Sequence, residues 1–91
     1  MKFNELQNIN ELTSYVESTY SKHYASANGV QSMDLISASG LGLNCCLGNV
    51  LKYASRYGKK NGANRKDLMN IMHYTLLAIN EYVLKESDNE T

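Results

Sequence analysis

The sequence predicts an all-α domain, and three observations support this class. The 91 residues include no proline, their apolar residues recur at spacings of three and four, and strict apolar/polar alternation is scarce. A chain of this length forms one small domain, residues 1–91, around a thin core. Because a thin core leaves apolar surface uncovered, we expect a homo-oligomer.

An N-terminal helix is expected at about residues 4–21, where one apolar stripe runs along the chain. The stripe consists of Leu6, Ile9, Leu12, Val16 and Tyr20. The small, polar residues 22–30 are expected to form a loop. Residues 31–39 are expected to form a short helix, which Gly40 ends in the left-handed conformation.

A third helix is expected at residues 44–57, followed by Gly58 as its stop signal. Its apolar residues at helical spacing are Leu47, Val50, Leu51 and Ala54. Gly48 lies inside this helix, where glycine costs about 1 kcal/mol of helix propensity relative to alanine. We therefore expect Gly48 to mark the close approach of another backbone.

The last helix is expected at residues 65–85 and, with the helix before it, forms a helical hairpin around a basic turn at residues 58–64. Asn64 is the expected N-cap, and Asp67 is an acid in the first turn. The apolar face of this helix comprises Leu68, Ile71, Met72, Thr75, Ile79 and Tyr82, widened by Leu76 and Val83. The polar, acidic tail, residues 86–91, is expected to fray.

The formal net charge of zero conceals a segregation of charge along the chain. Residues 1–51 carry −2, residues 52–66 carry +6 and residues 67–91 carry −4. The six cations of the central window are Lys52, Arg56, Lys59, Lys60, Arg65 and Lys66, with no acid among them. An ordinary soluble surface mixes both signs, so this window is a candidate anion-binding surface. The alternative is a solvated helix face without a ligand.

Aromatic residues accompany this basic window. Lys52 and Arg56 lie four residues apart and share one helix face, and Tyr53 and Tyr57 form a row beside them. Cationic side chains neutralise phosphates, and aromatic rings stack on nucleobases. This pattern is typical of a site for a phosphorylated, base-containing ligand, although the two tyrosines can also be the edge of a core.

Several other classes are excluded by what the sequence lacks. No apolar run approaches the roughly 18–20 residues that span a bilayer, so we expect no membrane partner. The N-terminus has no apolar segment typical of a secretory signal. The two cysteines, Cys45 and Cys46, are neighbours and form no disulfide framework. These features together favour a cytoplasmic protein.

The sequence also lacks the usual signatures of catalysis. The two histidines, His23 and His73, have no metal-ligand partners at the required spacing, so no metal site and no cofactor are expected. Residues 58–62 lack the strand, helix and Ser/Thr context of a phosphate-binding loop. The acids needed for metal-dependent phosphate cleavage are missing from residues 44–57. We expect no catalytic residues, although whether the protein is an enzyme stays open.

Several short motifs follow one another in a specific order over about residues 22–82. They are His23-Tyr24, Gly29-Val30, Asp34-Leu35-Ile36, Gly40-Leu41, Gly48-Asn49-Val50-Leu51-Lys52-Tyr53, Arg56, Gly58-Lys59-Lys60 and Asp67-Leu68, followed by Tyr74 and Leu77. This order resembles a small family of tailed-bacteriophage proteins of unknown function. The chain departs from the family pattern at residues 43–46, where an aromatic residue often precedes the Gly-Asn pair.

The resemblance implies nucleotide handling. Members of this family occur alone or as the C-terminal part of a phage nucleotide kinase that lacks ordinary kinase motifs. The matching positions are His23, Tyr24, Asn49, Lys52, Tyr53, Arg56, Lys59 and Lys60. The chain is also similar in type, but not in motif, to small oligomeric helical phage proteins that sequester cyclic nucleotide signals of bacterial immunity.

We therefore expect an anti-defence binding protein of the infected host's cytoplasm. It would sequester, without cleavage, a phosphorylated signal of the cyclic nucleotide or cyclic ADP-ribose type. The expected ligand-binding residues are His23, Tyr24, Asn49, Lys52, Tyr53, Arg56, Tyr57, Lys59 and Lys60. The alternatives are a nucleoside monophosphate kinase or its accessory domain and, third, a nucleic-acid-binding protein.

Overall fold

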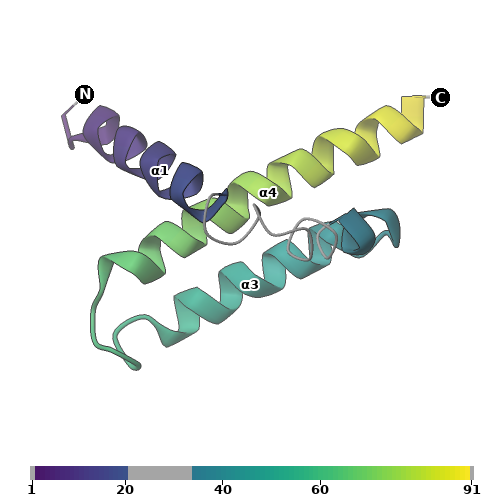
Figure 1. Cartoon of the computed structure of the whole chain (residues 1–91). Coiled ribbons are helices and arrows are strands. Elements are labelled where there is room, and N and C mark those ends of the chain that lie inside the picture. The colour runs from purple at the N-terminus through teal and green to yellow at the C-terminus, as the bar shows by residue number, and fades with distance from the viewer. Residues whose placement is uncertain (1, 21–33, 91) are drawn as a thin grey trace.

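Three long helices dominate the structure, a computed structural model that describes residues 2–20 and 34–90. They are α1 (Glu5–Thr19), α3 (Gly42–Arg56) and α4 (Arg65–Glu90), and residues 34–38 form a further short helix (Figure 1). These described residues include no strand, so the predicted all-α class is confirmed. None of their helices is both long enough and apolar enough to cross a membrane.

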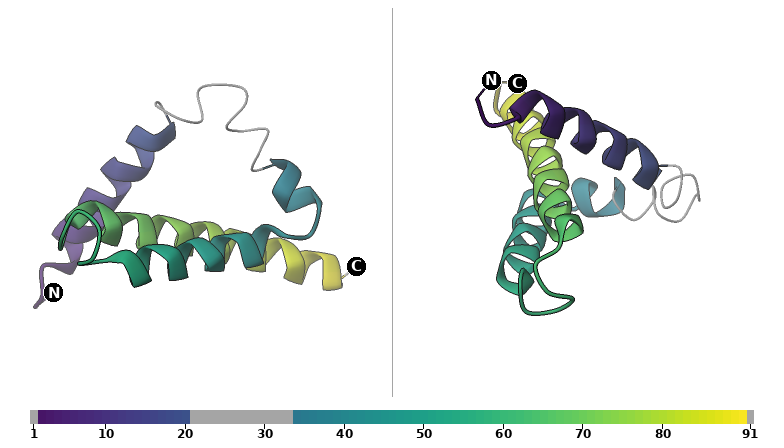
Figure 2. Two further views of the ribbon diagram at one scale, coloured as in Figure 1. Left: turned by 90° about the horizontal axis from the view of Figure 1, so that it is seen from below. Right: turned by 90° about the vertical axis from the view of Figure 1, so that its left-hand side faces the viewer.

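The α3 and α4 helices form the predicted hairpin, and α1 packs mainly against α4. In Figure 1, α3 and α4 run antiparallel, side by side, from the turn that joins them. Figure 2 shows that α1 lies across the N-terminal half of α4, on a different side of it from α3. The contact of α4 with α3 is far larger than its contact with α1. The fold is therefore a helical hairpin with one helix laid across it.

The helix ends follow local signals that the sequence predicts. Gly40 and Gly58 have φ angles of 83° and 82°, a left-handed conformation that glycine adopts without a steric cost. Asn64 caps α4, because its side-chain oxygen accepts a hydrogen bond of 2.8 Å from the backbone N–H of Asp67. Gly58 and Asn64 set the ends of α3 and α4 at the basic turn, whereas Gly40 follows the short helix at residues 34–38.

Two helix boundaries differ from the prediction. The α3 helix starts at Gly42, two residues before the expected start. The Glu81 carboxylate lies over Gly42, where a Cβ atom would collide with it. Glu81 also accepts a hydrogen bond of 3.1 Å from the Ser37 hydroxyl. The α4 helix continues to Glu90, so the expected frayed tail is helical over residues 86–90. These residues contain neither glycine nor proline to stop a helix.

The single chain contradicts the prediction for Gly48. A Cβ atom placed on this residue would meet nothing within 4 Å, so no backbone of the described residues approaches it. Gly48 is exposed on α3. Gly48 therefore lowers the helix propensity of α3. No close packing within the described chain requires a glycine at this position.

The core is small, and the expected apolar faces contribute little to it. Among the described residues, the buried apolar side chains are Leu12, Cys46 and Ala78. Most of the α1 stripe is exposed, including Leu6, Ile9 and Tyr20. On α4 the helix face against α3 is instead the one that carries Asp67, Tyr74 and Glu81. The predicted apolar face of α4 is thus mostly in contact with solvent.

The candidate ligand site between three helices

The antiparallel hairpin brings aromatic residues of α3 and α4 together. The rings of Tyr53 and Tyr74 are stacked, with their centroids 5.9 Å apart and their planes 17° from parallel. His73 lies next to this pair, and the Tyr15 ring of α1 meets the His73 ring edge-on at 6.1 Å. Three helices therefore contribute rings to one aromatic cluster.

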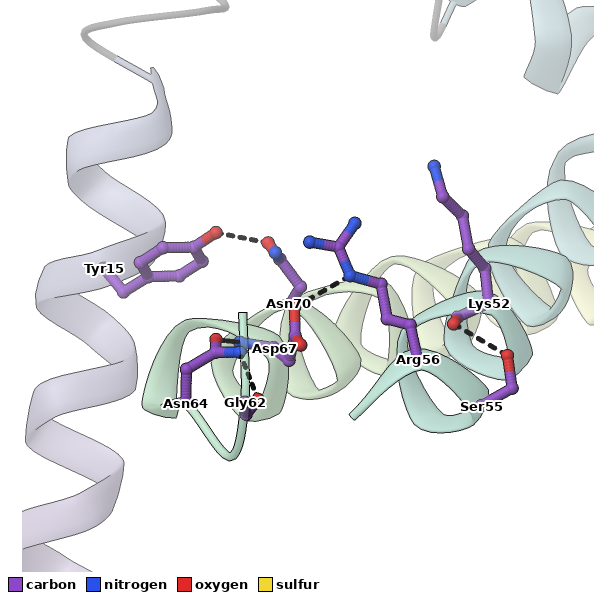
Figure 3. Close-up of polar contacts among 8 residues, drawn as sticks. All are labelled: Tyr15, Lys52, Ser55, Arg56, Gly62, Asn64, Asp67 and Asn70. Carbon is purple, nitrogen blue, oxygen red and sulfur yellow. Dashed lines mark hydrogen bonds and ion pairs between the residues drawn. The ribbon is translucent and has the colours of Figure 1, made fainter. Parts of the chain in front are cut away.

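This cluster lines a pocket of about 300 Å³, which we call the aromatic pocket. Its lining residues are Tyr15, Thr19, Tyr53, Lys66, Asn70, His73 and Tyr74. The Tyr15 hydroxyl donates a hydrogen bond to the Asn70 side-chain oxygen across the gap between α1 and α4 (Figure 3). The volume is at the lower end of the range for small-molecule sites. It has room for one base or one sugar phosphate.

Two cationic groups lie over the Tyr53 ring at the edge of this pocket. The Lys52 ammonium and the Arg56 guanidinium each lie 5.3 Å from its centroid. Both groups extend to the same side of α3 in Figure 3. Lys66 lines the pocket from α4. The pocket and its edge therefore combine aromatic surface with positive charge.

Arg56 is also tied to the first turn of α4. Its Nε atom lies 3.4 Å from Oδ1 of Asp67, a carboxylate that is only 2% exposed. The geometry makes this an ion pair without a hydrogen bond, because Nε has no hydrogen-bond acceptor. The two terminal nitrogens of Arg56 point away from Asp67 (Figure 3). Arg56 therefore joins α3 to α4 and still presents N–H donors on its outer side.

A second acid from outside the basic window pairs with Arg65. The Nε atom of Arg65 lies 2.5 Å from Oε2 of Glu11, and one terminal nitrogen donates a hydrogen bond to Asn8. This pair fixes α1 to the start of α4, and the contact lowers the pKa of the exposed Glu11 carboxyl. The remaining window cations, Lys52, Lys59, Lys60 and Lys66, form no ion pair with a described acid. The chain thus neutralises two of the six cations by folding.

The predicted site residues separate into three groups. Tyr53 lines the aromatic pocket, and Lys52 and Arg56 lie at its edge. The described lining does not include the predicted residues Asn49, Tyr57, Lys59 and Lys60. The Asn49 amide donates to the Cys45 carbonyl oxygen of its own helix. His23 and Tyr24 lie outside the described residues.

Sequence reasoning missed most of the pocket lining. Tyr15, Thr19, Lys66, Asn70 and His73 were not among the expected binding residues, and Tyr74 entered only through a motif. A usable signal existed in the hairpin itself. In two antiparallel helices joined by a turn at residues 57–64, each residue of the first helix faces a residue of the second. The two residue numbers of such a facing pair add up to nearly the same value along the whole hairpin. That rule places Arg56 near Asp67 and Tyr53 near Asn70 and Tyr74.

Burial shifts the pKa of two titratable groups of the hairpin, His73 and Cys46. Burial lowers the pKa of His73, so its imidazole is neutral at pH 7. Burial also raises the pKa of the Cys46 thiol, with smaller contributions from Cys45 and Glu81, which keeps this thiol protonated and unreactive. No group of three His, Cys, Asp or Glu side chains that could hold a metal ion occurs in residues 2–20 and 34–90.

Fold and site together define a small all-α protein with a helical hairpin and a basic, aromatic pocket. The chain belongs to the family DUF3310, proteins of unknown function, whose model matches residues 18–75, more than half of the chain. No curated protein and no solved structure matches it.

Proposed function

We propose that the protein binds a small phosphorylated nucleotide ligand in the aromatic pocket and retains it without cleaving it. The observation that carries this proposal is the combination of rings and unpaired lysines at one site. Tyr53, Tyr74 and His73 supply aromatic surface, and Lys52 and Lys66 supply positive charge. Base stacking contributes about 1–3 kcal/mol per base.

The size of the pocket limits which part of the ligand enters it. A volume of about 300 Å³ accepts one nucleotide unit of a larger cyclic molecule. The remaining phosphates would then lie near Lys52 and the outer nitrogens of Arg56. The lysines of the turn, Lys59 and Lys60, do not line the pocket, and the proposal assigns them no contact with the ligand.

The biological role that we propose follows from the resemblance to tailed-phage proteins. In an infected bacterium, a small abundant binding protein lowers the free concentration of a nucleotide signal by mass action. The absence of predicted catalytic residues supports retention of the ligand rather than turnover. The role is therefore proposed to be sequestration of an immune signalling nucleotide.

Isothermal titration calorimetry against cyclic di- and trinucleotides and cyclic ADP-ribose isomers tests this proposal. For the ligand that binds, we expect Lys66→Gln and Tyr74→Leu each to weaken affinity about tenfold or more, because one charge-assisted contact or one stacked base is lost. Lys60→Gln is the matched control, because it removes the same charge outside the pocket lining. We expect it to change affinity less than about twofold.

Three outcomes would contradict the proposal. The absence of binding heat with every ligand overturns it. Equal losses of affinity for Lys60→Gln and Lys66→Gln would indicate that the ligand binds at the turn and not in the aromatic pocket. Formation of labelled nucleoside diphosphate from ATP and a deoxynucleoside monophosphate would replace sequestration with the kinase alternative.

A further inference from the structure

An exposed apolar stripe runs along α4 on the side away from α3. We call Leu68, Met72, Leu76, Ile79 and Val83 the α4 stripe. Their side chains are between 41% and 55% exposed. At 3.6 residues per turn, all five lie within an arc of about 80° around the helix. Leu68 and Ile79 are eleven residues apart, as are Met72 and Val83, a repeat that keeps such a stripe nearly parallel to the helix axis.

The single chain exposes more surface than a compact protein of its mass. Its accessible surface is 6754 Å², against about 5,300 Å² expected for a folded monomer of this size. Its radius of gyration is 14.7 Å, against about 12 Å expected for a compact domain. The excess surface exceeds the roughly 800 Å² that each partner buries in a standard interface.

We propose that a second copy of this chain covers the α4 stripe, with the two α4 helices antiparallel about a two-fold axis. The spacing of the stripe supports this symmetry. With the axis between residues 75 and 76, Leu68 faces the partner's Val83 and Met72 faces the partner's Ile79. The two Leu76 side chains meet beside the axis. Every stripe residue then contacts an apolar residue of the other copy.

Charge favours the antiparallel arrangement over the parallel one. The α4 helix begins with Arg65 and Lys66, and its last residues include Glu86, Asp88 and Glu90. In the proposed register, Arg65 lies opposite the partner's Glu86. A parallel pair would instead bring like charges together at both ends, which is unfavourable.

The α1 helix extends this surface. A groove of about 430 Å³ lies between α1 and the first turns of α4, lined mainly by Ile9, Leu12, Leu68, Met69 and Met72. In the proposed dimer the C-terminal half of the partner's α4 lies along this groove, and the arrangement is reciprocal. Exposed Ile9, which lines the groove, would be covered as well. The α4 positions in the aromatic pocket, 66, 70, 73 and 74, lie on another side of α4, so the two proposals are independent.

Sedimentation analysis of the full chain tests the interface. We expect the wild-type protein to have a mass near twice the 10.2 kDa of one chain at micromolar concentration. Leu76→Glu places two carboxylates beside the axis and should yield monomers. Leu51→Glu is the matched control, because Leu51 is 70% exposed on α3 and outside the stripe; this variant should remain dimeric. A monomeric wild type, or a dimeric Leu76→Glu variant, overturns the proposal.

A complementary pair of variants tests the register. Met72→Glu and Ile79→Lys should each fail to form a homodimer, whereas their mixture should form a heterodimer in which Glu and Lys face each other. A mixture that remains monomeric overturns the antiparallel register. If either variant loses its helical circular dichroism signal alone, recovery of that signal in the mixture supports the proposal, and its absence counts against it.

Discussion

At the residue scale, Asp67 is the point where the polar interactions of the hairpin converge. Its carboxylate accepts a hydrogen bond of 2.9 Å from the Asn64 amide and pairs with Arg56. Its backbone N–H donates to the Asn64 side chain. A carboxylate that is 2% exposed requires such partners, because an unpaired buried charge is strongly unfavourable. Asp67 thereby holds the turn, α3 and α4 in one arrangement.

Replacing Asp67 should therefore destabilise the hairpin. We expect Asp67→Ala to lower the free energy of unfolding by about 1–3 kcal/mol, since Arg56 and Asn64 both lose a partner while Arg56 retains some access to water. Asp67→Asn, which keeps an acceptor oxygen, should cost less. Urea denaturation measures both changes. Glu17→Ala, which removes an exposed carboxylate of α1, is the control, and an equal effect of this control would refute the role of Asp67.

His73 predicts a specific pH dependence of stability. Because burial lowers its pKa in the folded state, the unfolded chain takes up the proton at a higher pH. The contribution of the neutral imidazole is complete above the ordinary histidine pKa of about 6.5 and is lost as the pH falls below it. Urea midpoints of the wild type should therefore decline from about pH 7.5 to about pH 5.5. The decline should be smaller in His73→Gln, and parallel curves would count against this reading.

At the element scale, the helices divide their surfaces in an unexpected way. The α4 helix packs a mixed polar face on α3 and leaves its more apolar face exposed. Glu81 and Asp67 explain this choice, because each makes polar contacts along the α3 side that would be lost if α4 rotated. Polar contacts therefore orient α4 in the single chain and leave its apolar face exposed.

Gly48 allows a test within α3. Since a Cβ atom there meets nothing within 4 Å, we expect Gly48→Ala to stabilise the protein by about 0.5–1 kcal/mol through higher helix propensity. Thermal unfolding measures the gain as a rise in the midpoint. A loss of stability would show that another backbone approaches Gly48 in the assembled protein.

At the scale of the whole molecule, three helices with few buried side chains enclose too little apolar surface for a robust monomer. The described core contains only Leu12, Cys46 and Ala78 as buried apolar residues. The exposed faces of α1 and α4 contain the apolar residues that a larger core would use. The proposed association of two subunits would cover these faces.

This reasoning predicts that thermal stability depends on protein concentration. In the proposed dimer only folded chains associate. The thermal unfolding midpoint of the wild type should therefore rise with each tenfold increase in protein concentration. The midpoint of Leu76→Glu should not change with concentration. Differential scanning calorimetry at several concentrations measures both, and a midpoint of the wild type that is independent of concentration would contradict the expectation.

The sequence by itself determined the features that depend on local physics. The helical periodicity, the glycines at positions 40 and 58, the Asn64 cap and the resulting hairpin all involve residues within a few positions of one another. The basic window and its association with Tyr53 were also readable, because charge and helical spacing are properties of the chain.

The tertiary structure alone decided which surfaces meet. Glu11 and Asp67 arrive beside Arg65 and Arg56 from outside the basic window, so the local absence of acids overstated the free charge. The aromatic pocket likewise joins residues from three helices. The packing angle and register of helices arise from contacts between side chains of residues that are far apart in the sequence. These contacts override the apolar pattern of any one helix.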